Sequence, residues 1–136
     1  MDLIHSVQEK FRGLLPDVLG MQLVEVTQDK VVATLKVRAE LCTAGGVLHG
    51  GSIMAFADTL GAVGTIVNLP PGATTATIES KTNFIGGAAL GTTVTGESTP
   101  VHKGRTTQVW QTRVTGADGK LVALVTQTQI VKPLRG

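Results

Sequence analysis

Aromatic residues are scarce in this sequence, which has three phenylalanines, one tryptophan and no tyrosine among its 136 residues. Proteins that bind single-stranded nucleic acid stack its bases on aromatic side chains, so that kind of binding surface is missing. Charged residues are also few, at 16% of the chain, and the formal net charge is only +2. So small and scattered a charge does not form a basic surface for nucleic acid or for a membrane. We therefore expect neither as a partner.

The chain has one cysteine, Cys42, and three histidines, His5, His49 and His102. A lone cysteine excludes an internal disulfide and fits a reducing compartment. The histidines are far apart and none has a second ligand at zinc spacing, so we expect no metal site. The first residues, MDLIHSVQEKF, lack the basic region and the apolar core of a signal peptide. Together these features predict a cytoplasmic protein.

Apolar residues are abundant, at 42% of the sequence, and 136 residues suffice for a single domain with a substantial core. They are densest in Val47–Val67, where they cover every side of a helix, and a helix that is apolar all round is expected to be buried. Asp58, Gly61 and Gly64 interrupt this run and argue against a membrane span. Each glycine costs a helix about 1 kcal/mol, so we expect another element to pack closely there.

The rest of the chain predicts a short N-terminal helix and a set of strands. Apolar residues at helical spacing favour a surface helix over Asp2–Arg12, and Leu14–Leu19 is expected to be a connector interrupted by Pro16. Six segments have the alternation or the threonine and valine content of strands: Met21–Thr27, Val31–Arg38, Ala73–Ile85, Thr92–Val101, Arg105–Thr115 and Leu121–Val131. The last four are long with short links, which predicts an antiparallel meander. The expected fold class is α+β, with five or six antiparallel strands wrapped around one long central helix.

The central helix begins with His49-Gly50-Gly51-Ser52, where backbone N–H groups lack intrahelical partners and the helix dipole is positive. An electron-rich oxygen can bind there, and glycine lets it approach closely. Asp58 is the one charge in the helix, and burying a lone carboxylate is unfavourable unless it is paired. Gly50 and Asp58 are eight residues apart, or about 12 Å along a helix, too far for one small group to touch both. If both are functional, the site must combine two chains, which predicts a homodimer.

This order of elements, with GGVLHGG at the helix start and an acid nine residues after the histidine, resembles the hotdog-fold acyl-CoA thioesterases. The closest group is the branch of the phenylacetic-acid-degradation (PaaI-type) and hydroxybenzoyl-CoA thioesterases. The resemblance extends from about Leu14 to Val131 and depends on the combination of motifs, since HGG alone is a weak signal. It implies hydrolysis of an acyl-CoA thioester without a metal or a cofactor, in a homo-oligomer whose minimal active unit is a dimer and which is often a tetramer.

The resemblance also implies a role for each matching residue. The family's polarising backbone amide matches Gly50, its adjacent histidine matches His49, and its catalytic acid, nucleophile or general base, matches Asp58. A polar residue that helps to position water falls near Thr77, and Thr43 stands where the family usually has asparagine or glutamine. The implied substrate-binding residues are the second glycine of the helix start, a strand aromatic and the hairpin crossed by the coenzyme A arm: Gly51, Phe84, His102, Lys103, Gly104, Arg105 and Thr106.

Other interpretations of the same residues stay open. Asp58 can be a structural acid bonded to a neighbour, and His49 is better suited to orienting the Gly50 loop than to transferring a proton. Lys103 and Arg105 can be solvated hairpin charges. Two other functions compete: a hotdog enoyl-thioester hydratase or dehydratase, whose local motif is not found here, and a non-catalytic acyl-CoA-binding protein. Regulators of the second kind usually carry a DNA-binding segment, and no helix-turn-helix fits the short N-terminus.

Overall fold

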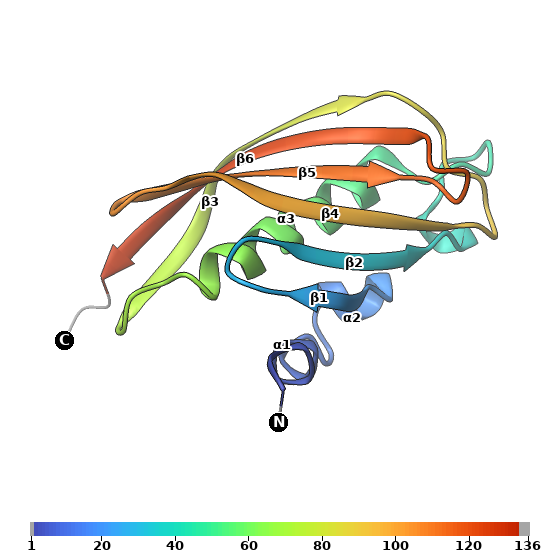
Figure 1. Ribbon diagram of the computed structural model, residues 1–136. Coiled ribbons are helices and arrows are strands. Elements are labelled where there is room, and N and C mark those ends of the chain that lie inside the picture. Colours follow the sequence, from blue (N-terminus) through green and yellow to red (C-terminus); the bar gives the residue numbers. More distant parts are fainter. Residues whose placement is uncertain (1, 134–136) are drawn as a thin grey trace.

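The structure, a computed structural model, describes residues 2–133 of the chain. Its elements are α1 (Leu3–Lys10), α2 (Leu15–Leu19), β1 (Gln22–Val26), β2 (Val31–Lys36), the 3-10 turn η1 (Ala39–Leu41), α3 (Gly50–Ile66), β3 (Ala73–Phe84), β4 (Thr93–Lys103), β5 (Thr107–Thr115) and β6 (Leu121–Pro133). The six strands form one antiparallel sheet in the order β1-β2-β4-β5-β6-β3. The sheet curves around α3, as Figure 1 shows. The expected fold class, with six strands and a short N-terminal helix, is confirmed.

The predicted meander is wrong for β3. This strand does not lie beside β4 but crosses over to the far edge, where it pairs with β6 along its length. The link after it does not turn back, because the N–H groups of Ile85 and Gly86 both donate to the carbonyl of Val122, at 2.9 and 3.0 Å. Only β4, β5 and β6 form a meander, joined by the two expected hairpins. Local patterns predict a strand, but its neighbours are decided by which arrangement covers the helix.

The segment Leu14–Leu19 is also not a simple connector, because most of it forms the short helix α2. Pro16 lies in the first turn of this helix, where the missing N–H has no intrahelical partner to lose. Gly20 ends the helix with a φ of 77°, in the left-handed region that glycine adopts most readily. Proline therefore starts a helix here instead of interrupting a loop.

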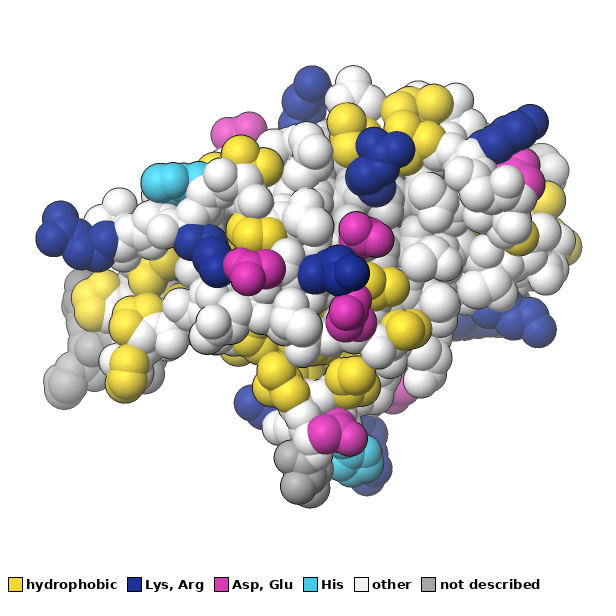
Figure 2. Space-filling view, in the orientation of Figure 1, with side chains coloured by type: hydrophobic (Ala, Val, Ile, Leu, Met, Phe, Trp, Pro, Cys, Tyr) yellow, Lys and Arg dark blue, Asp and Glu magenta, His cyan; other side chains and the backbone are white. Residues whose placement is uncertain are grey.

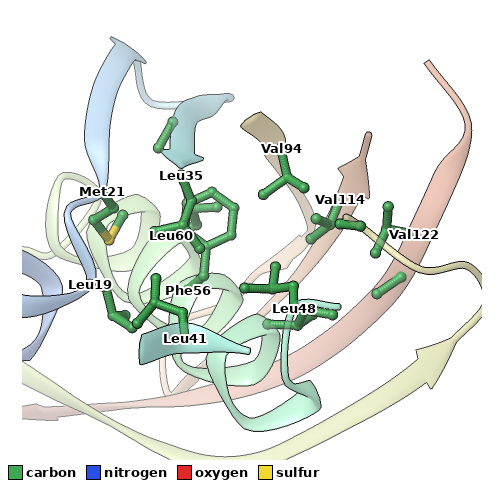
Figure 3. Packing of buried hydrophobic residues seen from close by; sticks show 14 of the residues in the cluster. Leu19, Met21, Leu35, Leu41, Leu48, Phe56, Leu60, Val94, Val114 and Val122 are labelled. Carbon is green, nitrogen blue, oxygen red and sulfur yellow. The ribbon is translucent and has the colours of Figure 1, made fainter. Parts of the chain in front are cut away.

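The core lies between α3 and the concave face of the sheet. Figure 3 shows Phe56 and Leu60 of the helix pointing toward Leu35, Val94 and Val114 of the strands. The prediction of burial on every side is wrong within one chain, however, since Met54 is 37% exposed and Ile66 is 50% exposed. Asp58 lies four residues after Met54, and therefore on the same face of the helix, and it is intermediate in burial. One stripe of α3 is thus left partly uncovered.

The two helix glycines have the close packing that their presence predicts. A Cβ atom on Gly61 would lie 2.3 Å from the amide of Gln127 on β6, and one on Gly64 would lie 2.7 Å from the ring of Trp110 on β5. Helix α3 therefore lies directly against these two strands, which brings Asp58 close to side chains of the sheet.

No helix within residues 2–133 is long and apolar enough to cross a membrane. On the face seen in Figure 2, basic side chains are interspersed with acidic and uncharged ones.

Candidate active site

The start of α3 is held in place by His49. This residue is the N-cap, and its Nδ1 accepts a hydrogen bond of 2.7 Å from the N–H of Gly51. A neutral imidazole that accepts at Nδ1 carries its proton on Nε2. The backbone N–H of His49 in turn donates to the carbonyl of Leu41 over 2.9 Å. The imidazole and the preceding loop together fix the glycine turn.

Gly50, the first residue of α3, lies directly beside Phe84 at the end of β3. A Cβ atom on Gly50 would be only 3.0 Å from Cε1 of the Phe84 ring, which is itself 56% exposed. The N–H of Gly50 has no acceptor among residues 2–133, whereas that of Gly51 is used by His49. This free N–H at the positive end of the helix can bind an electron-rich oxygen. The structure thus brings two of the sequence-predicted site residues together, 34 positions apart in the chain.

Asp58 is held by one of its two carboxylate oxygens. Thr77 on β3 donates its hydroxyl hydrogen to Oδ1 of Asp58 over 2.6 Å, and Nε2 of Gln127 lies 3.4 Å from the same oxygen. Within the described part of the chain, Oδ2 has no hydrogen-bond partner. An ionised carboxylate with one anchored and one open oxygen can serve as a general base or as a nucleophile.

Thr43 is not joined to the other candidate catalytic residues. Its hydroxyl and its N–H both donate to the carbonyl of Val47, over 3.3 and 2.8 Å, so they close the loop before α3. The side chain is exposed and has no hydrogen bond to Gly50 or Asp58 among the described residues. Within one chain the hydrogen bonds to Val47 fix the shape of that loop, and a role for Thr43 in catalysis stays a prediction.

The β4–β5 hairpin, residues 102–106, lies at the opposite end of α3. Nζ of Lys103 is 2.8 Å from Oδ1 of Asp29 and 3.4 Å from Oδ1 of Asn68, just beyond the end of the helix. Arg105 has no ion-pair partner in residues 2–133. With Thr106 it borders a cavity of about 370 Å³ whose other walls are Pro70, Pro71, Gly72, Ala73, Val131 and Pro133. The remaining two hairpin residues pack on each other, since a Cβ on Gly104 would lie 2.3 Å from Nε2 of His102.

Residues 45–123, more than half of the chain, match the family model described as the thioesterase superfamily. The chain belongs to the thioesterase superfamily. Among its relatives, a 1,4-dihydroxy-2-naphthoyl-CoA hydrolase of Listeria monocytogenes is 28% identical over 89% of this chain and 98% of that protein.

Solved structures agree with this assignment. A thioesterase of Haemophilus influenzae superposes with a TM-score of 0.93 at 26% identity, over 100% of this chain and 94% of the other. A hypothetical thioesterase of Streptococcus pneumoniae, solved with coenzyme A, gives a TM-score of 0.83 at 25% identity, over 95% and 99% of the two chains. The hotdog fold expected from the resemblance is thereby confirmed, and the protein is an enzyme of the thioester hydrolase type.

Sequence reasoning missed two residues near the centre of this thioesterase, Gln127 and Gln129 on β6. Gln127 is 1% exposed and contacts Asp58 on α3, whereas Gln129 is 0% exposed and contacts Thr77 on β3. The signal was present in the alternation of β6, since every second residue of a strand faces the same side. Val125 is buried on the inner face, and the next two inward positions hold glutamine instead of an apolar residue.

The candidate residues of the thioesterase fall into three groups along α3. Gly50, with His49, Gly51 and Phe84, lies at its N-terminal end, Asp58 with Thr77 lies near its middle, and the hairpin lies beyond its C-terminal end (Figure 1). Because α3 is one unbroken helix from Gly50 to Ile66, Gly50 and Asp58 are about 12 Å apart along its axis. No three histidine, cysteine or acidic side chains within residues 2–133 come together as in a metal site.

Proposed function

We propose that this protein is an acyl-CoA thioesterase in which Asp58 of one chain and the Gly50 N–H of another act on the same thioester. The observation that carries the proposal is the geometry of Asp58. It is the one charged residue of α3, and its Oδ1 is fixed by Thr77 while its Oδ2 is open. A positioned carboxylate of this kind is what general-base or nucleophilic attack on a thioester requires.

The reaction follows from these two groups. The thioester carbonyl oxygen accepts a hydrogen bond from the Gly50 N–H, which stabilises the negative charge that develops during attack. Oδ2 of Asp58 either takes a proton from a water molecule that attacks the carbonyl carbon, or attacks it directly to give an anhydride that water then hydrolyses. In both routes the bond from carbon to sulfur breaks, the coenzyme A thiolate takes up a proton, and water supplies the hydroxyl group that completes hydrolysis to the free acid and regenerates the Asp58 carboxylate.

The proposal requires a homodimer, and the surfaces that one chain leaves uncovered support one. Among the described residues, no strand lies on the outer side of β3, and an unpaired strand edge is a template for pairing with a second chain. Ile78 on this strand is 58% exposed, and the stripe of α3 that contains Met54 and Ile66 is also uncovered. A tetramer built from two such dimers, as the resemblance implies, belongs to the same proposal. Light scattering of the purified protein measures both states.

The direct test is the release of free thiol from a panel of aryl-CoA and fatty-acyl-CoA substrates. We expect turnover of at least one class, and aromatic acyl groups come first because the Listeria relative is named for an aromatic acyl-CoA. Coenzyme A binding without thiol release would instead support a non-catalytic binding protein. Formation of a hydroxyacyl product from an enoyl-CoA would support the hydratase alternative.

The hairpin is proposed to bind the phosphates of coenzyme A mainly through Arg105. Replacing Arg105 with alanine should raise KM at low salt by up to about fivefold, the range of an exposed ion pair, and the effect should shrink at high salt. Kinetics at two ionic strengths measure this. An Arg105→Ala enzyme with unchanged KM at low salt would leave the arginine as a solvated surface charge.

Lys103 is expected to act through the position of the hairpin, because Asp29 already pairs with its charge. Lys103→Ala should therefore raise KM, and Asp29→Asn should raise it as well, since both changes remove the ion pair between the hairpin and the β1–β2 turn. The second variant keeps the lysine and its hydrogen bonds to Gln28 and Asn68 but removes its ion-pair partner. If Asp29→Asn lowers KM, Lys103 contacts the phosphates directly.

A further inference from the structure

Asp58 lies at the end of a chain of hydrogen bonds that starts in β3, passes through β6 and returns to β3. Thr75 donates its hydroxyl hydrogen to Oε1 of Gln129 over 3.1 Å. Nε2 of Gln129 then donates to Oγ1 of Thr77 over 2.6 Å, and Thr77 donates to Oδ1 of Asp58 over 2.6 Å. A hydroxyl has one hydrogen, and an amide nitrogen only donates. Because the Thr77 hydroxyl oxygen accepts a hydrogen bond from Gln129, its own hydrogen is directed to Asp58.

Gln127 makes a second contact from the same strand. Its Nε2 lies 3.1 Å from the backbone carbonyl of Asp58 and 3.4 Å from Oδ1. The amide reaches α3 only because Gly61 has no side chain, since a Cβ there would lie 2.3 Å from Nε2. Its Oε1 is buried without a hydrogen-bond partner among the described residues, which is unfavourable for folding. The glutamine therefore contacts Asp58 although half of its buried amide group is left unsatisfied.

We infer that Gln127 and Gln129 are positioning residues that hold Oδ1 of Asp58 and thereby present Oδ2 to the thioester. Both side chains are fully buried behind β3 and α3, so they act through Thr77 and Asp58 and not on the substrate. The inference rests on the proposed function, in which Asp58 is the catalytic acid. In addition, Gln129 on β6 sets the direction in which the Thr77 hydroxyl donates its hydrogen.

Gln129→Glu tests that direction, because it replaces the donating amide with an oxygen and changes little else in shape. At a pH high enough to ionise the introduced carboxyl, it accepts at both oxygens and draws the hydrogen of Thr77 away from Asp58, so the assay is run as a pH series. We expect kcat to fall about 10- to 100-fold, the range for losing a hydrogen bond to a charged group, while KM changes much less. Gln129→Met should lower kcat only about fivefold, since Thr77 can then still donate to Asp58 without guidance.

A double-mutant cycle separates positioning from a general loss of structure, and it decides the question even if Gln129→Glu does not fold. In a Thr77→Val background, Gln129→Met should have no further effect on kcat, because the group it acts through is gone. Gln127→Met should lower kcat by about fivefold with an unchanged or higher melting temperature, since it removes the unpaired Oε1. Additive effects in the cycle, or kcat values that simply follow the melting temperature, would overturn the inference.

Gln108 provides the matched control. It is a buried glutamine on the neighbouring strand β5, opposite Gln129 in register, and its Oε1 accepts from Nε1 of Trp110 without any contact to Asp58. Gln108→Met should lower the melting temperature and leave kcat unchanged. Asp58→Asn in the same assay separates the catalytic role of Asp58 from the positioning role of the two glutamines. An active Asp58→Asn enzyme contradicts the proposed function, whereas an inactive one with normal Gln127 and Gln129 variants contradicts only the positioning role.

Discussion

Replacing Asp58 with asparagine should lower kcat by at least about two orders of magnitude, the scale expected for loss of a general base or nucleophile. The substitution is nearly isosteric. Thr77 can still donate its hydrogen to the amide oxygen in the place of Oδ1, so the NH2 group replaces the open Oδ2. The anchored half of the side chain is thus kept and the reactive half is removed. We expect the fold and the affinity for acyl-CoA to stay near those of the wild type.

Three measurements check this prediction: thiol release for kcat, calorimetric titration with a non-hydrolysable acyl-CoA analogue for affinity, and thermal melting for the fold. Asp118→Asn is a suitable control, because Asp118 is an exposed turn residue whose Oδ1 accepts from the N–H of Lys120, as an asparagine also can. It should have normal kinetics. A folded Asp58→Asn enzyme with near-normal turnover would show that the carboxylate is structural.

The fold could be predicted from the sequence largely because its signals are local. The apolar run around Asp58 and the threonine- and valine-rich segments identify α3 and the six strands to within about two residues of their ends. The position of β3 could not be predicted in this way. Its pairing with β6 joins segments about 50 residues apart, and no pattern within β3 distinguishes β6 from β4 as its neighbour.

The residues of the candidate site likewise differ in whether a local sequence pattern predicts them. Asp58 and the turn at Gly50 stand out locally, as a charge in an apolar helix and as glycines at a helix start. The partners of Lys103 come from two distant segments, at Asp29 and Asn68, and no local pattern relates them. Gln127 and Gln129 lie between these cases. The alternation of β6 predicts that both side chains point inward. Their contact with Asp58 depends on the close approach of α3 to the sheet, and the absence of a side chain at Gly61 allows that approach.

Mixing two inactive variants should restore activity if the site is shared between chains. The first variant is Asp58→Asn and the second is Gly50→Pro, which lacks the backbone N–H. Proline is well suited to this position, since Gly50 is the first residue of α3 and His49 before it is extended, with φ −64° and ψ 140°. Gly50→Ala is the matched control, because it brings a Cβ against Phe84 as proline does but keeps the N–H. We expect Gly50→Ala to retain much more activity than Gly50→Pro.

The expected recovery follows from symmetry. An isologous dimer has two equivalent sites, so each heterodimer combines both lesions in one site and leaves the other site intact. Random exchange of equal amounts gives heterodimers as half of all dimers, and thus roughly a quarter of wild-type activity. Differently tagged chains allow the heterodimer to be isolated and its thiol release measured. Confirmed heterodimers that stay inactive would mean that each site is built within one chain, although Gly50 and Asp58 are about 12 Å apart along α3.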